Sequence, residues 1–328
     1  FLLGSVHAHA MIKAIEATAA KKAPGVVDVL TGVDWLADGF GSIPHNMGFS
    51  SPPDIVLENR DKSKRFVAPH YPLPADRARH VGEPVAMVIA ESYTQAQDAA
   101  ELINVDYTPL PPVIDTGMAA ETYPILWPDH GSNVGIDADV NNPAETAQLL
   151  NESAHVVSLK TQLARVSGVA MEPRSSLGEF GPDGRFTLTT TAGSIYRYKR
   201  ELAKLLGEKE ENVRIIIRDA GGSYGPRNAL YAEHALVLWA AKRLGRPVKW
   251  TSHRTESMLT DYQARDLVID ASLGFDANGQ IKALHTHNIS NIGAHSASWI
   301  PLVKGIEIAT VLYRVPTASA RAVAVQTN

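Results

Sequence analysis

A glycine-rich loop between a strand pattern and a helix pattern limits the folds open to this chain more than any other stretch. The loop occupies residues 219–227, with the sequence Asp-Ala-Gly-Gly-Ser-Tyr-Gly-Pro-Arg. The β-branched run at 213–218 predicts a strand before it, and apolar residues at helical spacing predict a helix over 229–244. Gly-Arg-Pro at 245–247 ends that helix, and residues 248–251 predict a second strand. Strand, loop, helix and strand together predict a parallel crossover unit, with the right-handed connection that such units adopt.

The loop is suited to bind a ligand through its backbone. Its glycines at positions 221, 222 and 225 allow positive φ angles and a close approach of a ligand to the main chain. Several N–H groups can then converge on an anion or on an oxygen atom bound to a metal, helped by the N-terminus of the following helix. A tight turn without a ligand explains the same spacing equally well. The loop has neither the GxxxxGK[ST] nor the GxGxxG spacing, so it matches neither nucleotide-binding fingerprint.

Composition excludes several classes of protein. The 31 Lys and Arg against 35 Asp and Glu give a net charge of −4, which argues against nucleic-acid binding and against attachment to an anionic membrane. No apolar run has the length of a membrane span, and no signal peptide is visible. The chain has no cysteine, which excludes a disulfide, a thiolate nucleophile, a zinc–thiolate site and an iron–sulfur cluster held by this chain.

The chain of 328 residues is long enough for about two domains. We predict one domain over residues 1–118, a connector over 119–140 and a second domain over 141–328. The chain begins at Phe1 without a methionine and stops at Asn328 within an apolar alternating stretch. We therefore expect it to be part of a larger polypeptide.

Two pairs of side chains are candidates for chemistry outside the loop. His7 and His9 lie two residues apart, so on a strand they would share one face and could bind a metal, or they could simply pack. Glu172 and Arg174 flank Pro173. They could lie near a cofactor, or they could form a structural ion pair or cap.

The motifs of the whole chain, taken together, resemble one family. The first part has Ser-Val-His-Ala-His-Ala at 5–10, Ala-Pro-Gly-Val at 23–26, Val-Gly-Glu-Pro-Val-Ala at 81–86 and Val-Asp-Tyr at 105–107. The second part has Met-Glu-Pro-Arg at 171–174, the glycine loop, Leu-Gly-Arg-Pro-Val-Lys-Trp at 244–250 and Ala-Arg-Asp at 264–266. With these motifs the chain is similar to the molybdopterin-binding large subunit of the xanthine dehydrogenase, aldehyde oxidase and carbon monoxide dehydrogenase family.

The resemblance implies an α+β fold, with an N-terminal α/β hammerhead domain followed by the first half of a mixed α/β molybdenum-cofactor-binding domain. It places the glycine loop against the molybdenum centre and implies no direct metal ligand from the protein. The family loop is usually Gly-Gly-Gly-Phe-Gly, so Tyr224 stands where an aromatic residue's backbone approaches the metal's oxo ligand. Ser223 either donates to the cofactor or only replaces a glycine. Arg227 pairs with an anionic cofactor group, in bidentate fashion with a phosphate, or is a solvated arginine at a helix start. The cofactor-binding residues implied are Gly221, Gly222, Ser223, Tyr224, Gly225 and Arg227.

Several positions depart from the family pattern. A glutamine that hydrogen-bonds a metal oxo group in the family falls at Gly193, which has no side chain. Xanthine-oxidising members have a glutamate just after the loop, where this chain has Asn228, and this argues against a purine substrate. A substrate-binding arginine of those members falls at Lys304. The family's catalytic glutamate lies far beyond Asn328, so this chain should supply one wall of the site and lack the general base.

The resemblance implies hydroxylation of an aldehyde, an N-heterocycle or carbon monoxide, with water as the oxygen source. The cofactor is molybdenum–molybdopterin, whose pterin form stays open, the cytosine dinucleotide form being one candidate. Electrons would pass to 2Fe-2S and FAD centres on partner chains, because this chain has no cysteine. The expected partners are the missing C-terminal half of the molybdopterin domain, an iron–sulfur small subunit, an FAD-binding medium subunit and a small-molecule substrate, in the cytoplasm or the periplasm. Two alternatives are a non-catalytic scaffold that binds cofactor or subunits, and an unrelated phosphate-ligand binder built on the same crossover unit.

Overall fold

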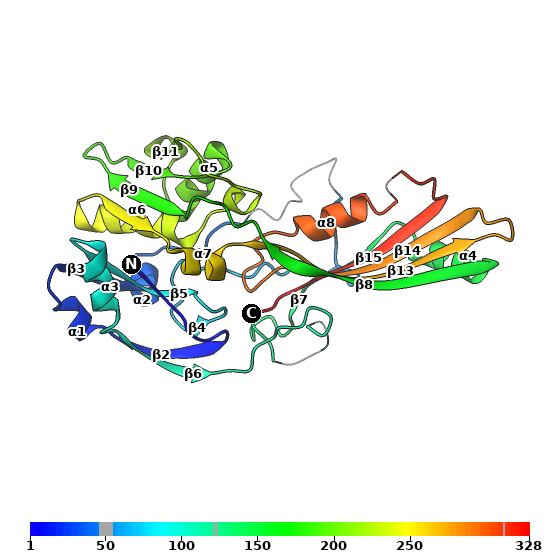
Figure 1. Cartoon of the computed structure of the whole chain (residues 1–328), viewed down its shortest axis with the longest axis horizontal. Helices are drawn as coiled ribbons and strands as arrows, with labels where there is room; N and C mark the ends of the chain where they lie inside the picture. Colours follow the sequence, from blue (N-terminus) through cyan, green and yellow to red (C-terminus); the bar gives the residue numbers. More distant parts are fainter. Residues whose placement is uncertain (46–54, 120, 122–123, 311) are drawn as a thin grey trace. The chain divides into compact units, whose positions relative to one another are not determined.

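A computed structural model describes residues 1–45, 55–119, 121, 124–310 and 312–328. The chain forms two compact units, each assembled from three segments (Figure 1). Unit 1 contains residues 1–45, 69–111 and 167–262, and unit 2 contains residues 46–68, 112–166 and 263–328. This division in space differs from the division along the sequence into 1–118 and 141–328, which stays a prediction. In the described part of the chain, no helix is both long and apolar enough to cross a membrane.

The N-terminal segments of unit 1 form two small sheets with short helices. The first sheet has the strand order β1-β5-β3 and the second has the order β4-β2-β6, and every pairing in both sheets is antiparallel. Helix α3 begins after the N-cap Ser92, whose hydroxyl accepts from the Gln95 N–H. The elements are β1 (Leu2–Gly4), β2 (Ala10–Glu16), α1 (Thr18–Lys21), β3 (Val26–Thr31), α2 (Gly32–Ala37), β4 (Arg77–Ala78), β5 (Pro84–Ala90), α3 (Tyr93–Ala100) and β6 (Asn104–Pro109).

The third segment of unit 1 contains the predicted crossover. Its four-stranded sheet has the order β11-β10-β9-β12, in which β10 pairs with β11 in parallel and both β10 and β12 pair antiparallel with β9. Strands β11 and β12 are therefore parallel, as predicted, although β10 and β9 lie between them. The elements are β9 (Ser175–Phe180), β10 (Phe186–Thr190), α5 (Ile195–Leu206), β11 (Val213–Ile216), α6 (Ala232–Leu244), β12 (Val248–Thr251) and α7 (Arg254–Thr260), with short 3₁₀ turns at Glu210–Asn212 and Pro226–Asn228.

Helices α5 and α6 pack on this sheet and share one apolar core with it. Helix α5 begins at the N-cap Ser194, whose hydroxyl accepts from the Arg197 N–H, and ends at Gly207 with φ 66°. Helix α6 lies so close to β9 that a Cβ at Gly178 would lie 2.5 Å from the carbonyl carbon of Val237. Glycine at this position therefore sets the spacing between helix and sheet.

The first turn of α6 is held by a buried histidine. The Nδ1 atom of His234 accepts a hydrogen bond from the Tyr231 N–H at 3.1 Å, so the neutral imidazole satisfies an amide at the helix start. Complete burial lowers the pKa of His234 to about 4, against the opposing charge of Glu233. The neutral form is therefore part of the folded structure.

This burial predicts a loss of stability in mild acid. The folded pKa of His234 lies below the usual value of 6.5, so the unfolded chain binds a proton first as the pH falls. The His234 contribution is complete above pH 6.5, falls towards pH 4, and should lower the free energy of unfolding by about 2 kcal/mol at about pH 5 relative to pH 7. Urea unfolding across this range measures the slope. His234→Gln is the control, because glutamine also caps at this position without titrating, and an unchanged slope in this variant would contradict the assignment.

Unit 2 is built on one five-stranded sheet with the order β7-β15-β14-β13-β8. Strands β13 and β14 form a long hairpin, with Gly279 at φ 78° in its turn (Figure 1). The predicted connector at 119–140 contains strand β7, which pairs antiparallel with β15. Part of the predicted connector is thus a β-strand, which the Pro and Gly residues of this stretch made hard to predict from the sequence. The elements are β7 (Val134–Val140), α4 (Pro143–Asn151), β8 (His155–Ser167), β13 (Gln263–Phe275), β14 (Ile281–Asn291), α8 (Ile300–Glu307) and β15 (Thr317–Val325).

Candidate functional site

The glycine loop that follows β11 has a backbone conformation that few sequences can adopt. Gly222 and Gly225 have φ angles of 118° and 102°, and Tyr224 between them has φ 51°. The left-handed region is uncommon for an aromatic residue. The loop is followed by the 3₁₀ turn Pro226–Asn228, and α6 begins only at Ala232. The helix predicted over 229–244 thus begins three residues later than expected, because Pro226 sets up a separate turn first, and the help of its N-terminus to the loop stays a prediction.

The loop presents unused hydrogen-bond donors. Among the described residues, the backbone N–H groups of Gly222, Ser223, Tyr224 and Gly225 make no hydrogen bond. These residues are exposed or half-buried, with the Tyr224 side chain 73% exposed. Consecutive N–H groups in such a turn form a concave site for an anion or an electron-rich oxygen. The backbone geometry is thus that of a binding loop as well as of a turn.

Glu172 fixes the start of this loop. Its Oε2 atom accepts from the Gly221 N–H at 2.7 Å and from Arg227 Nη1 at 3.1 Å, while Oε1 accepts from the Thr191 hydroxyl at 2.6 Å. The backbone carbonyl of Glu172 also accepts from Arg227 Nη2. One carboxylate therefore joins the loop's first glycine to the end of β10 and to the arginine after the loop.

Glu172 is ionised at neutral pH. Burial alone would raise the pKa of its carboxyl, but the hydrogen bonds from Thr191 and Gly221 and the charge of Arg227 outweigh burial and hold the pKa below its usual value. Arg227 is only 3% exposed, so its charge is neutralised by Glu172 inside the protein. The reading of Arg227 as a solvated arginine is wrong, because the side chain is buried against Glu172, and its pairing with an anionic cofactor group stays a prediction.

A second segment, residues 168–172, lies beside the loop, and from the sequence only Glu172 of this segment was considered to lie near a cofactor. A Cβ at Gly168 would lie 3.3 Å from Tyr224 Cβ, and a Cβ at Gly222 would lie 3.1 Å from Ala170 Cβ. Arg254 from α7 donates to the carbonyls of Ala170 at 2.8 Å and Met171 at 2.6 Å. Arg254 and Thr191 thus support the site from distant parts of the sequence, and no local sequence pattern predicts their role.

Arg174 belongs to a different, structural cluster. It is 5% exposed and donates Nε to Glu233 at 2.7 Å and a second nitrogen to Asp261. Its guanidinium carbon lies 4.2 Å from the centre of the Tyr231 ring. Glu172 and Arg174 are therefore structural partners of other residues rather than of each other.

The paired histidines and the Arg-Asp step also have structural roles. His9 is buried and its Nδ1 atom contacts the Pro111 carbonyl at 3.0 Å, while the His7 ring lies edge-on to Tyr107. Asp266 of the Arg-Asp step accepts from Arg165 at 2.9 Å and so forms a cross-strand pair in unit 2.

The predicted substrate residues lie in different units. Asn228 ends the 3₁₀ turn after the glycine loop in unit 1 and is exposed. Lys304 lies on α8 in unit 2, where its ammonium contacts Glu307 Oε2 at 2.6 Å. The side chain of Ser223 makes no hydrogen bond within the described residues. The structure brings Asn228 and the glycine loop together and leaves Lys304 as a separate proposal.

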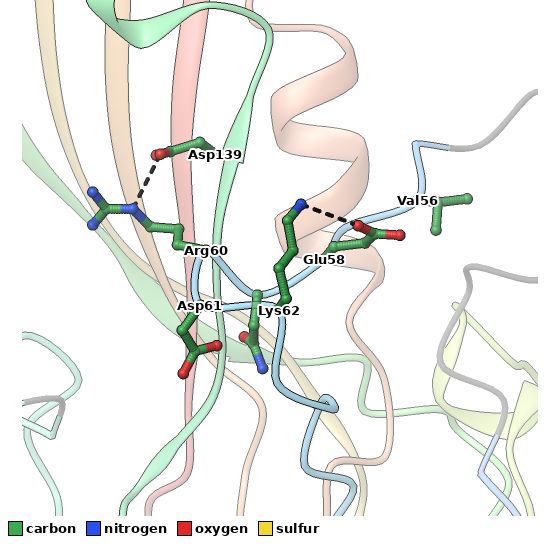
Figure 2. Close-up of a pocket in the computed structure, with 7 residues that line it drawn as sticks. Val56, Glu58, Arg60, Asp61, Lys62 and Asp139 are labelled. Atoms are coloured by element: carbon green, nitrogen blue, oxygen red, sulfur yellow. Dashed lines mark hydrogen bonds and ion pairs between the residues drawn. The ribbon is translucent and has the colours of Figure 1, made fainter.

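An open hollow of about 650 Å³ lies in unit 2, lined by residues 56 and 58–62 and by Asp139. Figure 2 shows two pairs among its charged side chains: Arg60 donates to Asp139 at 3.0 Å and Lys62 to Glu58 at 3.5 Å, while Asp61 points away from both. Exposed pairs of this kind contribute little free energy. Since these charges are already paired, the hollow is a weaker candidate for a binding site than the glycine loop.

Comparison with known proteins identifies the family. Residues 129–328 match the molybdopterin cofactor-binding domain, and residues 1–111 match the a/b hammerhead domain of aldehyde oxidase and xanthine dehydrogenase. The chain belongs to the molybdopterin-binding large-subunit family of xanthine dehydrogenase, aldehyde oxidase and carbon monoxide dehydrogenase. The predicted fold class, a hammerhead domain followed by part of a molybdenum-cofactor-binding domain, is confirmed.

Individual relatives agree with this assignment. The gamma subunit of the 6-hydroxypseudooxynicotine dehydrogenase complex of Paenarthrobacter nicotinovorans is 33% identical over 329 residues, which cover 100% of this chain and 40% of the relative. The carbon monoxide dehydrogenase large chain of Afipia carboxidovorans is 27% identical, over 99% of this chain and 40% of that one. Among solved structures, quinoline 2-oxidoreductase from Pseudomonas putida 86 superposes with a TM-score of 0.85 and 28% identity, over 100% of this chain and 40% of that chain. The present chain thus spans about 40% of the length of the relatives it matches.

The donor set of the loop fits a molybdopterin-type group. The free N–H groups of residues 222–225 suit the many acceptor atoms of such a cofactor, and Gly225 has open space on its Cβ side. Gly221 and Gly222 cannot accept a side chain without meeting Glu172 or Tyr224. The loop is therefore held in shape at Gly221 and Gly222 by the neighbouring side chains and is open at Gly225.

Proposed function

We propose that this chain is part of the large subunit of a molybdenum hydroxylase, and that its glycine loop binds the cofactor through the N–H groups of Gly222 to Gly225. The observation that carries the proposal is this row of free donors, fixed by Glu172, in a chain of the molybdopterin-binding family. When bound, the cofactor supplies the oxidation of a carbon centre with water as the oxygen source. The protein residues would position it: Glu172 and Arg227 hold the loop, and the backbone of Tyr224 would lie against the cofactor.

The proposed substrate class is a nitrogen heterocycle. Two relatives carry such names, 6-hydroxypseudooxynicotine dehydrogenase and nicotine 6-hydroxylase, the latter at 29% identity over 88% of this chain. Aldehydes and carbon monoxide are the other substrates that the family resemblance implies. Electrons would leave through 2Fe-2S and FAD centres on partner chains, and a catalytic glutamate would come from the rest of the large subunit. The pterin form, a cytosine dinucleotide or another, belongs to the same proposal.

A non-catalytic scaffold is the second candidate, because Gly193 offers no side chain to the cofactor. Metal analysis of the protein purified from its own host, with the chains that accompany it, separates the two. We expect stoichiometric molybdenum in the sample, with iron in the accompanying chains. A well-folded sample that contains no molybdenum would refute the hydroxylase proposal and favour the scaffold.

A further inference from the structure

The chain segment that leaves the glycine loop is held by a buried tyrosine of α5. The Tyr198 hydroxyl donates to the carbonyl oxygen of Arg227 at 2.9 Å and to that of Ala229 at 2.8 Å, so one proton is shared between two acceptors. The Arg227 carbonyl also accepts from the Gly193 N–H at 2.8 Å. The start of α5 and the residue before its cap therefore fix the 3₁₀ turn that follows the loop.

The Tyr198 side chain is itself held in one position. Its ring is fully buried in the core that α5 and α6 share, and the ring centre lies 4.9 Å from that of His234. Burial raises the pKa of Tyr198 above its usual value, so the phenol keeps its proton at neutral pH. The hydroxyl is therefore a permanent donor, and the two carbonyls satisfy it where water cannot reach.

The glycine loop is thus fixed at both ends and free between them. At its start, Glu172 accepts from the Gly221 N–H at 2.7 Å. At its exit, the Asn228 N–H donates to the Gly225 carbonyl at 3.0 Å, which links the last glycine of the loop to the turn held by the tyrosine. If the exit were not fixed, the free N–H groups of residues 222–225 could take several arrangements, and a ligand would have to order them on binding.

We infer that Tyr198 is a positioning residue of the glycine loop: its hydroxyl fixes the exit of the loop, as Glu172 fixes the start, and so keeps the free N–H groups in one arrangement. This inference goes beyond the proposed function, on which it rests only for the identity of the ligand. Tyr198 is separated from Arg227 by 29 residues and from Ala229 by 31, so its role arises only in the fold.

The test compares Tyr198→Phe with the wild type in the molybdenum-containing complex. Phenylalanine keeps the packing of the ring and removes only the hydroxyl, so the variant should fold, as its melting temperature shows. Deuterium uptake, measured by mass spectrometry, reports the N–H groups of Gly193 and Asn228, whose hydrogen bonds define the loop exit. We expect them to exchange about fivefold faster, the effect of losing one hydrogen bond. Molybdenum should also leave the complex about fivefold faster on dialysis, since weaker binding appears mainly as faster dissociation.

Tyr262→Phe is the control with the same chemical change. The Tyr262 hydroxyl donates to the Leu230 carbonyl at 2.7 Å, one residue beyond the contacts of Tyr198. This variant should lower the melting temperature by a similar amount but leave exchange at the loop exit and molybdenum loss unchanged. Equal effects of the two variants, or wild-type exchange or molybdenum loss in Tyr198→Phe, would overturn the inference. Absence of molybdenum from the wild type would instead refute the proposed function, and the exchange comparison would still decide whether Tyr198 fixes the loop.

Discussion

Replacing Arg174 by alanine should destabilise unit 1 by about 3–5 kcal/mol, because it leaves buried carboxylates without their partner. Arg174 satisfies Glu233, Asp261 and, at 2.7 Å, the Thr260 hydroxyl. Burial alone would lower the pKa of Arg174. The negative charge of Glu233 is the largest of the opposing effects, which together raise the pKa above its usual value. Glu233 is itself 3% exposed, so water cannot replace the lost cation. Urea unfolding, followed by circular dichroism, measures the loss.

Arg246→Ala is the matched control for this prediction. Arg246 also makes a bidentate pair, with both nitrogens 3.0 Å from Glu91, but both side chains are exposed. Water replaces such a partner readily, so this variant should leave the free energy of unfolding nearly unchanged. Equal losses in the two variants would show that burial does not govern the strength of these pairs.

Signals that act over a few residues predicted the local structure well. Ser92 and Ser194 start helices as their side chains indicate, and Gly207 ends one in the left-handed conformation. The glycine loop was located because positive φ angles favour glycine. Tyr224, which shares this conformation, was placed in the site only by resemblance to the family.

Contacts between distant segments could not be predicted in the same way. Glu172 and Gly221 are separated by 49 residues, and nothing in either local sequence encodes their hydrogen bond. The position of β12 next to β9 depends on the packing of the whole sheet. The contact between Gly193 and Asn228 is likewise encoded in neither local sequence. In the sequence, glycine at 193 is only a missing side chain, whereas in the structure the Asn228 side chain fills the space that a side chain at 193 would need.

Glu172→Ala should release the glycine loop and lower the molybdenum content of the purified complex. The variant removes the acceptor for the Gly221 N–H and for Thr191 and leaves the Arg227 charge buried. We expect a loss of about 3 kcal/mol in the free energy of unfolding, reduced from the value for a fully buried pair because Glu172 is partly exposed. Loop amides that are no longer held in one conformation bind a ligand less tightly, because binding must then order them.

Two further variants separate the charge of Glu172 from its shape. Glu172→Gln keeps an acceptor for Gly221 but leaves Arg227 without a counter-charge, so it should fall between the wild type and Glu172→Ala in both stability and molybdenum content. Glu179→Ala, a half-buried glutamate of β9 with no ion pair among the described residues, should match the wild type. Wild-type molybdenum content in a destabilised Glu172→Ala would falsify the view that this carboxylate shapes the loop for the cofactor. In that case the salt bridge serves only the fold, and the free N–H groups keep their arrangement through the φ angles of Gly222, Tyr224 and Gly225 alone.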